Sequence, residues 1–255
     1  MRRFRVIPIL LLQNGGLYKT IRFSNARYIG DPVNAVKIFN DKEVDELIVL
    51  DIGASRNQKP PQFEKLKELA GEAFMPMGYG GGITSVDEIK RIIFSGYEKV
   101  ILNSALLTNK RILTEGASLL GSQSIVVSVD YRKNLFGKAK VYVTAGQKNT
   151  GVSPIDFARE MEDLGAGELI LHSIDRDGTY SSYDIEMINK VSHSVSIPIV
   201  VCGGASAITD FAPAVHAGAS AVAAGSLFVY HGNTRGILLN YPSQKELYTL
   251  LFSHF

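Results

Sequence analysis

Hydrophobic residues in this chain gather in short runs that are separated by segments of helical periodicity. The runs are rich in β-branched residues and are typical of strands that are buried on both faces. The segments between them, such as residues 63–73 and 86–95, place apolar residues every three to four positions. This alternation predicts parallel strands joined by crossover helices. The runs are Val6–Leu12, Leu47–Leu50, Lys99–Leu102, Ile125–Val129, Leu169–Leu171, Ile197–Val201 and Ala221–Ala224.

The chain also matches itself at an offset of 122 residues. Four β/α units in each half give eight, which is the size of a closed (β/α)8 TIM barrel built from two duplicated half-barrels. An open doubly wound sheet is the alternative. No linker rich in proline or serine separates the halves, so we predict a single domain over residues 1–255, with half-barrels of about 1–122 and 123–255. The matched positions are Glu46 and Glu168, Pro76 and Pro198, Gly81-Gly82 and Gly203-Gly204, Gly96 and Gly218, and Ser104 and Ser226.

Composition narrows the classes of function without naming one. A formal charge of +2 gives no reason to expect a nucleic acid partner, and the single cysteine, Cys202, excludes an internal disulfide and fits a reducing cytoplasm. Arg2-Arg3 and the apolar run after them imitate a signal peptide, but that run contains Pro8 and lacks a cleavage site of small residues. No run approaches the roughly 18 apolar residues of a membrane span. We therefore expect a cytoplasmic protein.

Glycine pairs stand at the ends of two predicted strands that the offset relates. In a barrel, chemistry is located where the strands end, and glycine there lets backbone N–H groups approach an anion. Gly81-Gly82 is followed at the next strand end by Asn103-Ser104, and Gly203-Gly204 is followed by Gly225-Ser226. Each pair could instead form only a tight turn. The recurrence favours two phosphate sites on opposite sides of one mouth, and a substrate with a phosphate at each end.

Longer motifs carry a resemblance that covers nearly the whole chain. The chain resembles HisF, the cyclase subunit of imidazole glycerol phosphate synthase. The related isomerase HisA shares the barrel and both phosphate sites, but the segment SIDRDGT (173–179) and a set of four charged residues favour HisF. The motifs are GDPVNA, DELIVLDI, YGGGI, GSQSIVVSVD, GAGELILHSIDRDGT, YDIEMI and SIPIVVCGGA.

The resemblance implies an activity and, at one position, a departure from it. HisF proteins take ammonia from a HisH glutaminase subunit through the barrel interior to a bis-phosphorylated ribulosyl substrate, where two aspartates act as general acid and base. Asp130 matches the aspartate of the fifth strand, whereas Leu11 occupies the position of the first. Leucine cannot exchange a proton, and the loss of one such partner typically costs about 10²–10⁴ in rate. We therefore expect a weakened cyclase that needs neither cofactor nor metal.

Further site residues follow from the same resemblance. The four charged residues match a ring that gates ammonia beside the glutaminase, although a salt-bridged ring could also simply plug the barrel floor. His172 lies in a strand that faces the mouth, where it could contact substrate or belong to the core. The ring is Arg5, Glu46, Lys99 and Glu168, and the expected substrate contacts, besides the glycine and hydroxyl positions above, are Lys19 on a mobile first loop, Asp51, Asp177 and Gly178.

The sequence leaves three interpretations of the function open. The segment RGILLNYPS (235–243) and the leucines of the first strand resemble a HisF-like branch that accompanies surface-polysaccharide amino-sugar enzymes. In that branch ammonia goes to a third protein, which forms an amidine on a sugar, and we take this as the leading interpretation. An ordinary cyclase that uses Asp130 with a substitute such as Asp51 is the first alternative. A non-catalytic protein that binds a phosphorylated ligand and activates the glutaminase is the second.

Overall fold

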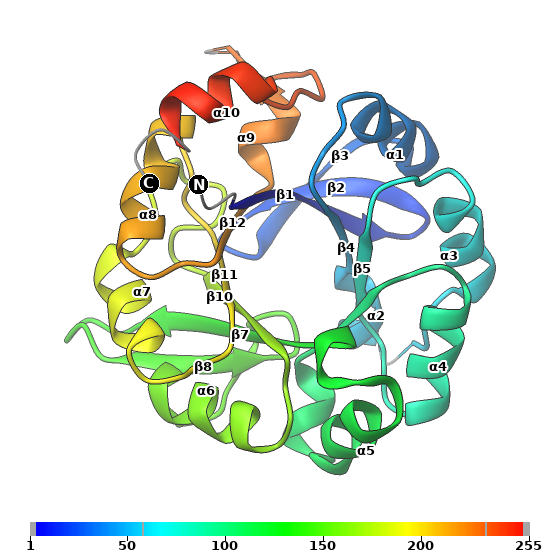
Figure 1. Cartoon of the computed structure of the whole chain (residues 1–255), viewed down its shortest axis with the longest axis vertical. Helices are drawn as coiled ribbons and strands as arrows, with labels where there is room; N and C mark the ends of the chain where they lie inside the picture. Colours follow the sequence, from blue (N-terminus) through cyan, green and yellow to red (C-terminus); the bar gives the residue numbers. More distant parts are fainter. Residues whose placement is uncertain (1–3, 58, 233, 252–255) are drawn as a thin grey trace.

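Eight parallel strands form a closed ring with helices around it, in a computed structural model that describes residues 4–57, 59–232 and 234–251 (Figure 1). Each strand pairs with the next along the chain, and the eighth strand pairs with the first, which closes the barrel. The predicted TIM barrel is confirmed. The barrel strands are β1 (Arg5–Gln13), β4 (Leu47–Asp51), β5 (Met77–Gly80), β6 (Lys99–Leu102), β7 (Ile125–Lys133), β10 (Glu168–Ser173), β11 (Ile199–Cys202) and β12 (Ala221–Ala224).

Helices cover the outside of the barrel, and several of them begin at a side chain that caps the helix. Ser85 and Glu88 form a reciprocal capping box at α4, and Asp31 accepts a hydrogen bond from Asn34 at the start of α1. None of the helices in the described ranges is both long and apolar enough to cross a membrane. The helices are α1 (Pro32–Asp41), α2 (Ile52–Asn57), α3 (Phe63–Ala70), α4 (Val86–Phe94), α5 (Arg111–Leu120), α6 (Pro154–Asp163), α7 (Ile185–Ser192), α8 (Phe211–His216), α9 (Ser226–Val229) and α10 (Gln244–Leu250).

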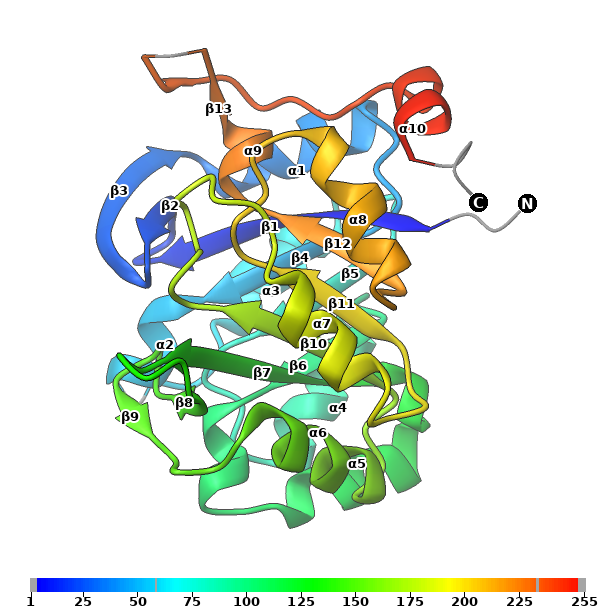
Figure 2. The same ribbon diagram turned by 90° about the vertical axis from the view of Figure 1, so that its left-hand side faces the viewer.

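Two antiparallel hairpins extend the barrel at the end where its strands finish, opposite the described ends of the chain (Figure 2). The first replaces the mobile loop expected after the first strand, so that Lys19 lies on a strand. The second continues from β7. The strands outside the barrel are β2 (Gly16–Ile21), β3 (Ser24–Gly30), β8 (Ala139–Val143), β9 (Lys148–Asn149), β13 (Tyr230–His231) and β14 (Gly236–Ile237).

Inside the ring, the inward side chains form three layers along the barrel axis. Because side chains alternate along a strand, β10 sends Glu168, Ile170 and His172 inward in turn. Glu168 belongs to a charged layer near the strand starts, Ile170 to an apolar middle layer and His172 to a layer near the strand ends. The apolar cluster inside the barrel contains Ile7, Ile9, Leu11, Ile48, Ile101, Val126, Ile170, Val200, Cys202, Ala221 and Ala223.

Candidate active site

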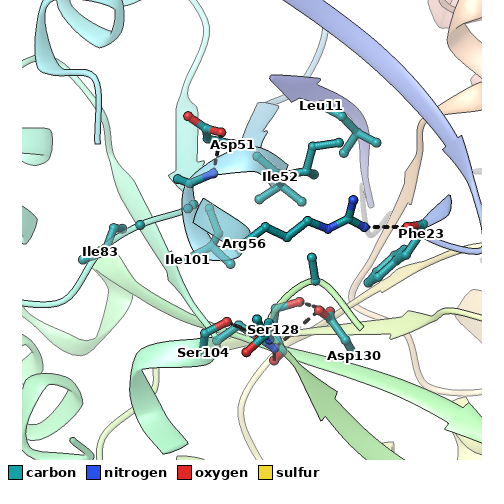
Figure 3. Close-up of a pocket in the computed structure, with 18 of the residues that line it drawn as sticks. Leu11, Phe23, Asp51, Ile52, Arg56, Ile83, Ile101, Ser104, Ser128 and Asp130 are labelled. Atoms are coloured by element: carbon teal, nitrogen blue, oxygen red, sulfur yellow. Dashed lines mark hydrogen bonds between the residues drawn. The ribbon is translucent and has the colours of Figure 1, made fainter. Parts of the chain in front are cut away.

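The ends of the barrel strands surround a cavity of about 630 Å³, which is within the usual range for a small-molecule site. Its two sides differ in chemistry. The side formed by β1, β4 and α2 carries the apolar Leu11 and Ile52 together with Asp51 and Arg56, whereas the opposite side carries Ser104, Ser128 and Asp130 (Figure 3). At the end of β1 itself, Leu11 gives the cavity an apolar wall.

Asp130 is buried on β7 and lines the polar side of the cavity. Ser128 Oγ donates a hydrogen bond to Asp130 Oδ1 at 2.6 Å, and Asn103 Nδ2 donates to Oδ2 at 3.4 Å. Burial raises the pKa of Asp130, while His172 and the Ser128 hydroxyl offset part of this effect. A carboxylate of this kind accepts a proton more readily than an exposed one, as a general base must.

Leu11 lies on the opposite side of the cavity and brings no ionisable group to it. It neighbours Leu50 in the register of β1 with β4 and packs in the apolar cluster inside the barrel. Asp51, at the end of β4, also lines the cavity, but its Oδ1 accepts hydrogen bonds from the N–H groups of Gly53 and Ala54, both at 3.0 Å. Asp51 thus holds the first turn of α2 in place, as a capping residue does.

Lys19 and Asp177 both line the edge of the cavity, and their opposite charges attract one another. Lys19 is 4% exposed, and a Cβ added to Gly225 would lie 1.9 Å from its Nζ, so the ammonium group occupies the space above that glycine. Thr20 Oγ1 donates to Asp177 Oδ2 at 3.2 Å. Burial lowers the pKa of Lys19, and the charge of Asp177 opposes that shift.

The β2–β3 hairpin closes over this edge of the cavity. The Phe23 ring packs edge-on against the His172 ring with their centroids 4.8 Å apart, and the Arg22 N–H donates to the Asp177 carbonyl at 2.9 Å. Arg56 reaches across the cavity and donates to the Phe23 carbonyl at 2.8 Å (Figure 3). Arg22 and Phe23 both have positive φ, 53° and 61°, a conformation that costs a residue with a side chain roughly 1–2 kcal/mol. Strain of this kind is found at functional sites.

The first predicted phosphate site lines the cavity. Gly81 and Gly82 have φ of 123° and 71°, and a Cβ at either position would lie 2.4 Å from a backbone oxygen, of Asp51 and Lys59 respectively. Only glycine fits such positions without a shift of the backbone. Asn103 and Ser104 line the same side, and Ser104 Oγ accepts a hydrogen bond from the Thr144 N–H at 2.9 Å.

The second predicted site lies mostly beneath the segment that joins β10 to α7. The Ser182 N–H donates to the Gly204 carbonyl at 2.8 Å, and Tyr180 Oη donates to the Ser226 carbonyl at 3.3 Å. Gly225 lines the cavity, whereas Gly203, Gly204, Ser226 and Gly178 do not. Phosphate binding at either site stays a prediction.

The four residues of the predicted charged ring, Arg5, Glu46, Lys99 and Glu168, meet at the other end of the barrel. Lys99 Nζ lies 3.0 Å from Glu46 Oε2 and 2.7 Å from Glu168 Oε2, and Arg5 forms ion pairs with both glutamates. Both carboxylates are at most 5% exposed. Two cations and two anions thus neutralise one another below the apolar layer, and none of the four lines the cavity.

The sequence analysis missed some residues of the site and left the role of one residue open. Phe23, Arg56 and Ser128 line the cavity and were not predicted to. The sequence left open whether His172 contacts substrate or belongs to the core, and the structure shows that it lines the cavity. Its position two residues after Ile170, which points into the barrel, was the sequence feature that could have indicated this. In the described part of the chain, no three His, Cys, Asp or Glu side chains are arranged to hold a metal ion.

Comparison with known proteins places this geometry in a family. The profile of the family described as "Histidine biosynthesis protein" matches residues 5–235. A protein of Leptospira interrogans, named "Putative imidazole glycerol phosphate synthase subunit HisF", is 45% identical over 254 residues, 99% of this chain and 100% of that protein.

Two further relatives agree with this assignment. A Pseudomonas aeruginosa protein named as subunit hisF2 of the same synthase is 45% identical over 248 residues, 97% of this chain and 99% of its own length. The imidazole glycerol phosphate synthase subunit HisF of Alkaliphilus metalliredigens is 40% identical over 228 residues, 89% of this chain and 90% of its own length. The chain belongs to the HisF family of histidine biosynthesis proteins.

Proposed function

We propose that this chain is a synthase subunit that receives ammonia from a HisH-type glutaminase at the charged ring and conducts it through the barrel interior to an acceptor at the C-terminal face, where the cavity opens. The observation that carries the proposal is the order of the three layers along the axis. A buried charged ring, an apolar interior and a cavity with polar groups follow one another inside a single barrel. An uncharged nitrogen source is thereby kept from water until it reaches the acceptor.

The ring is the entry for ammonia in this proposal. Its carboxylates are buried and its cations partly buried, and such charges are costly to bury unless each is paired. A ring held by ion pairs can open when one pair is exchanged for contacts with a partner protein. Phe74 and Phe94 supply apolar surface for such a partner, because each is at least 80% exposed. Phe74 lies just before the start of β5, at the same end as the ring.

The interior supports passage of a small neutral molecule. Its lining is aliphatic apart from Cys202, and Ala221 and Ala223 on β12 are small. Leu11 extends this apolar lining to the cavity. A carboxylic acid in its place could protonate ammonia on the way, whereas leucine leaves it as the neutral nucleophile.

Leu11 is also the reason to expect a weak standard cyclase reaction in this chain. Asp130 and Lys19 are in the cavity, but the second member of the acid–base pair is missing, and such a loss costs about 10²–10⁴ in rate. The leading acceptor is therefore a different one: a sugar of a surface polysaccharide, on which a third enzyme forms an amidine group. Two relatives carry the numbered names hisF2 and hisF3, which fit paralogues of HisF.

An ordinary cyclase is the second candidate, because the cavity keeps Asp130, Lys19 and the Gly81-Gly82 turn. In that case Asp51 would replace the missing carboxylate. Burial does raise the pKa of Asp51, but the N–H groups of Gly53 and Ala54 hold its Oδ1 against α2. Those hydrogen bonds oppose the rise in pKa only in part, but they engage Oδ1 with the start of α2, so this oxygen is not free for proton transfer.

The test supplies the purified protein with the ribulosyl bis-phosphate and saturating ammonium chloride, and follows loss of the substrate. We expect the natural chain to be slower than its Leu11→Asp variant by about 10² or more. Leu11→Asn, which has a similar shape but cannot exchange a proton, is the matched control and should stay slow. Fast turnover by the natural chain would overturn the proposal and favour the ordinary cyclase.

A further inference from the structure

A buried histidine on the polar side of the cavity is not explained by the proposed function. His172 is 4% exposed and lines the cavity from β10. Two carboxylates flank its ring, with Asp130 Oδ1 3.8 Å from Nδ1 and Asp177 Oδ1 3.5 Å from Nε2. Its Nε2 has no hydrogen-bond partner among the described residues. A core histidine would normally have both nitrogens satisfied.

The strand register fixes this arrangement. His172 stands beside Asp130 in the parallel pairing of β10 with β7, and beside Cys202 in the pairing of β10 with β11. These inward positions belong to neighbouring strands at the level where the barrel opens into the cavity. The contact between His172 and Asp130 therefore follows from the fold and does not depend on a flexible loop.

The two carboxylates beside His172 have environments that push their pKa values apart. Burial raises the pKa of Asp130. Burial acts in the same direction on Asp177, but His172, Lys19 and the Thr20 hydroxyl outweigh it and hold the pKa of Asp177 below its ordinary value. Neighbouring acids with diverging pKa values take different roles in a site. Asp177 stays ionised and orients the ring, whereas Asp130 is able to take up a proton.

The two carboxylates that face His172, Asp130 on β7 and Asp177 in the segment after β10, favour its charged form. Cys202 on β11 and the uncharged Phe23 ring also lie beside it, and Lys19 on β2 is a cation that opposes the charge. Burial alone works to lower the pKa of His172, but Cys202 and Asp177 outweigh it, and the pKa is well above its ordinary value. The two flanking carboxylates thus favour the imidazolium form of the ring, which has a proton to give.

We infer that His172 is the proton-transfer partner of Asp130 in this cavity and supplies, from the strand beside Asp130, the second proton-transfer group that Leu11 cannot supply from the opposite side. The inference rests on the proposed function only in that ammonia meets its acceptor here. When ammonia adds to a carbonyl carbon, a C–N bond forms and the π bond of the carbonyl breaks. Asp130 takes a proton from the new nitrogen, and His172 Nδ1 gives one to the oxygen. Transfer of the proton from Asp130 back to His172 restores both groups.

The test measures the effect of His172→Gln on ammonia-dependent turnover of the ribulosyl bis-phosphate, in the natural chain and in Leu11→Asp. We expect the natural chain to show slow turnover above the level of Asp130→Asn. His172→Gln should lower that turnover about 100-fold or more, mainly in kcat. In the Leu11→Asp background it should change the rate by no more than about threefold, because residues that act as one unit are not additive. His193→Gln, an exposed histidine at the end of α7, is the control and should have no effect.

The pH profile separates proton transfer from a structural role. Turnover by the natural chain should fall on the alkaline side at the pKa of His172, measured independently from its imidazole NMR signals. Asp177→Asn keeps the histidine but removes the anion at Nε2, so it should move both the NMR titration and the alkaline limb to lower pH. An alkaline limb that stays in place while the NMR titration moves would refute the inference.

Failure of the inference differs from failure of the proposed function. Absence of turnover above the Asp130→Asn level, or an equal effect of His172→Gln in both backgrounds, would overturn the role of His172 and leave ammonia delivery standing. Turnover at ordinary enzyme rates of about 1–10³ s⁻¹ that is insensitive to His172→Gln would overturn both. Slow, His172-dependent turnover in a chain that does not activate or accept ammonia from a HisH glutaminase would overturn only the proposed function.

Discussion

Replacement of Lys99 by methionine tests the charged ring most directly. Lys99 Nζ makes contacts of 3.0 Å and 2.7 Å with Glu46 and Glu168, whose side chains are 3% and 7% exposed. Methionine keeps most of the length and the apolar stem of lysine, so the change removes mainly the charge. One cation, Arg5, would then face two buried carboxylates.

The size of the effect follows from the burial of these groups. Removal of one partner from a buried ion pair typically destabilises a protein by about 3–5 kcal/mol, because an uncompensated charge stays in a poorly solvated place. The free energy of unfolding of a domain is only about 5–15 kcal/mol. In a chain of this size each kcal/mol corresponds to about 2–4 °C in Tm, so Lys99→Met should lower Tm by roughly 6–20 °C.

Urea and thermal unfolding followed by circular dichroism would measure the change. The double variant Lys99→Met/Glu46→Gln again balances one cation against one anion, and we expect it to regain most of the loss. Lys65→Met is the matched control: Lys65 pairs with Glu68 at 2.6 Å on the surface, where such a pair is worth about 0–1 kcal/mol. A cost for Lys99→Met no larger than the control, or strict additivity in the double variant, would refute the view that the ring is a mutually neutralised buried unit.

Three further predictions concern the interior, the cavity and pH. Ala223→Leu fills the interior beside β12, so in the Leu11→Asp background, with a HisH glutaminase bound, glutamine-driven turnover should fall at least about tenfold relative to ammonium-driven turnover; equal losses would contradict an internal route. Gly81→Ala should cost more stability in urea unfolding than Gly15→Ala, because both have positive φ but only the Cβ at Gly81 meets a backbone oxygen, of Asp51, at 2.4 Å; equal costs would count against this reasoning. The pKa of His172 is raised in the folded state, so the charged histidine contributes its full stabilisation of the fold below the unfolded pKa of about 6.5 and loses it as pH rises through the folded pKa. The loss of unfolding free energy caused by His172→Gln should therefore be larger near pH 6 than near pH 9. A larger loss near pH 9 would contradict the raised pKa.

The barrel could be predicted from the sequence because its strands are buried on both faces and read as continuous apolar runs. Several boundaries moved by one to four residues; the strand predicted at 125–129, for example, runs to Lys133 because it continues into the second hairpin. The predicted strand at 197–201 begins instead at Ile199, since Pro198 has no N–H group to donate, and the Pro198 carbonyl accepts from the Leu169 N–H at 2.9 Å. The predicted helix from Phe63 ends at Ala70, and Gly71 follows it.

The closure of the cavity could not be predicted from local pattern. The β2–β3 hairpin turns at Arg22-Phe23, and neither residue is a usual one for a turn with positive φ, so the sequence carried no hairpin signal there. The turn is supported by contacts with residues far along the chain, such as Asp177 and His172. The same holds for the second glycine pair, which the segment around Ser182 covers.

The separation of the charged ring from the cavity has an evolutionary consequence. The two ends share no residue, and an apolar layer lies between them. Under the proposed function, a substitution such as leucine at position 11 alters the chemistry at one end while the charged ring at the other end stays unchanged. After a gene duplication, such a barrel would acquire a new product in a few steps, because the end proposed to receive ammonia would not have to change with it.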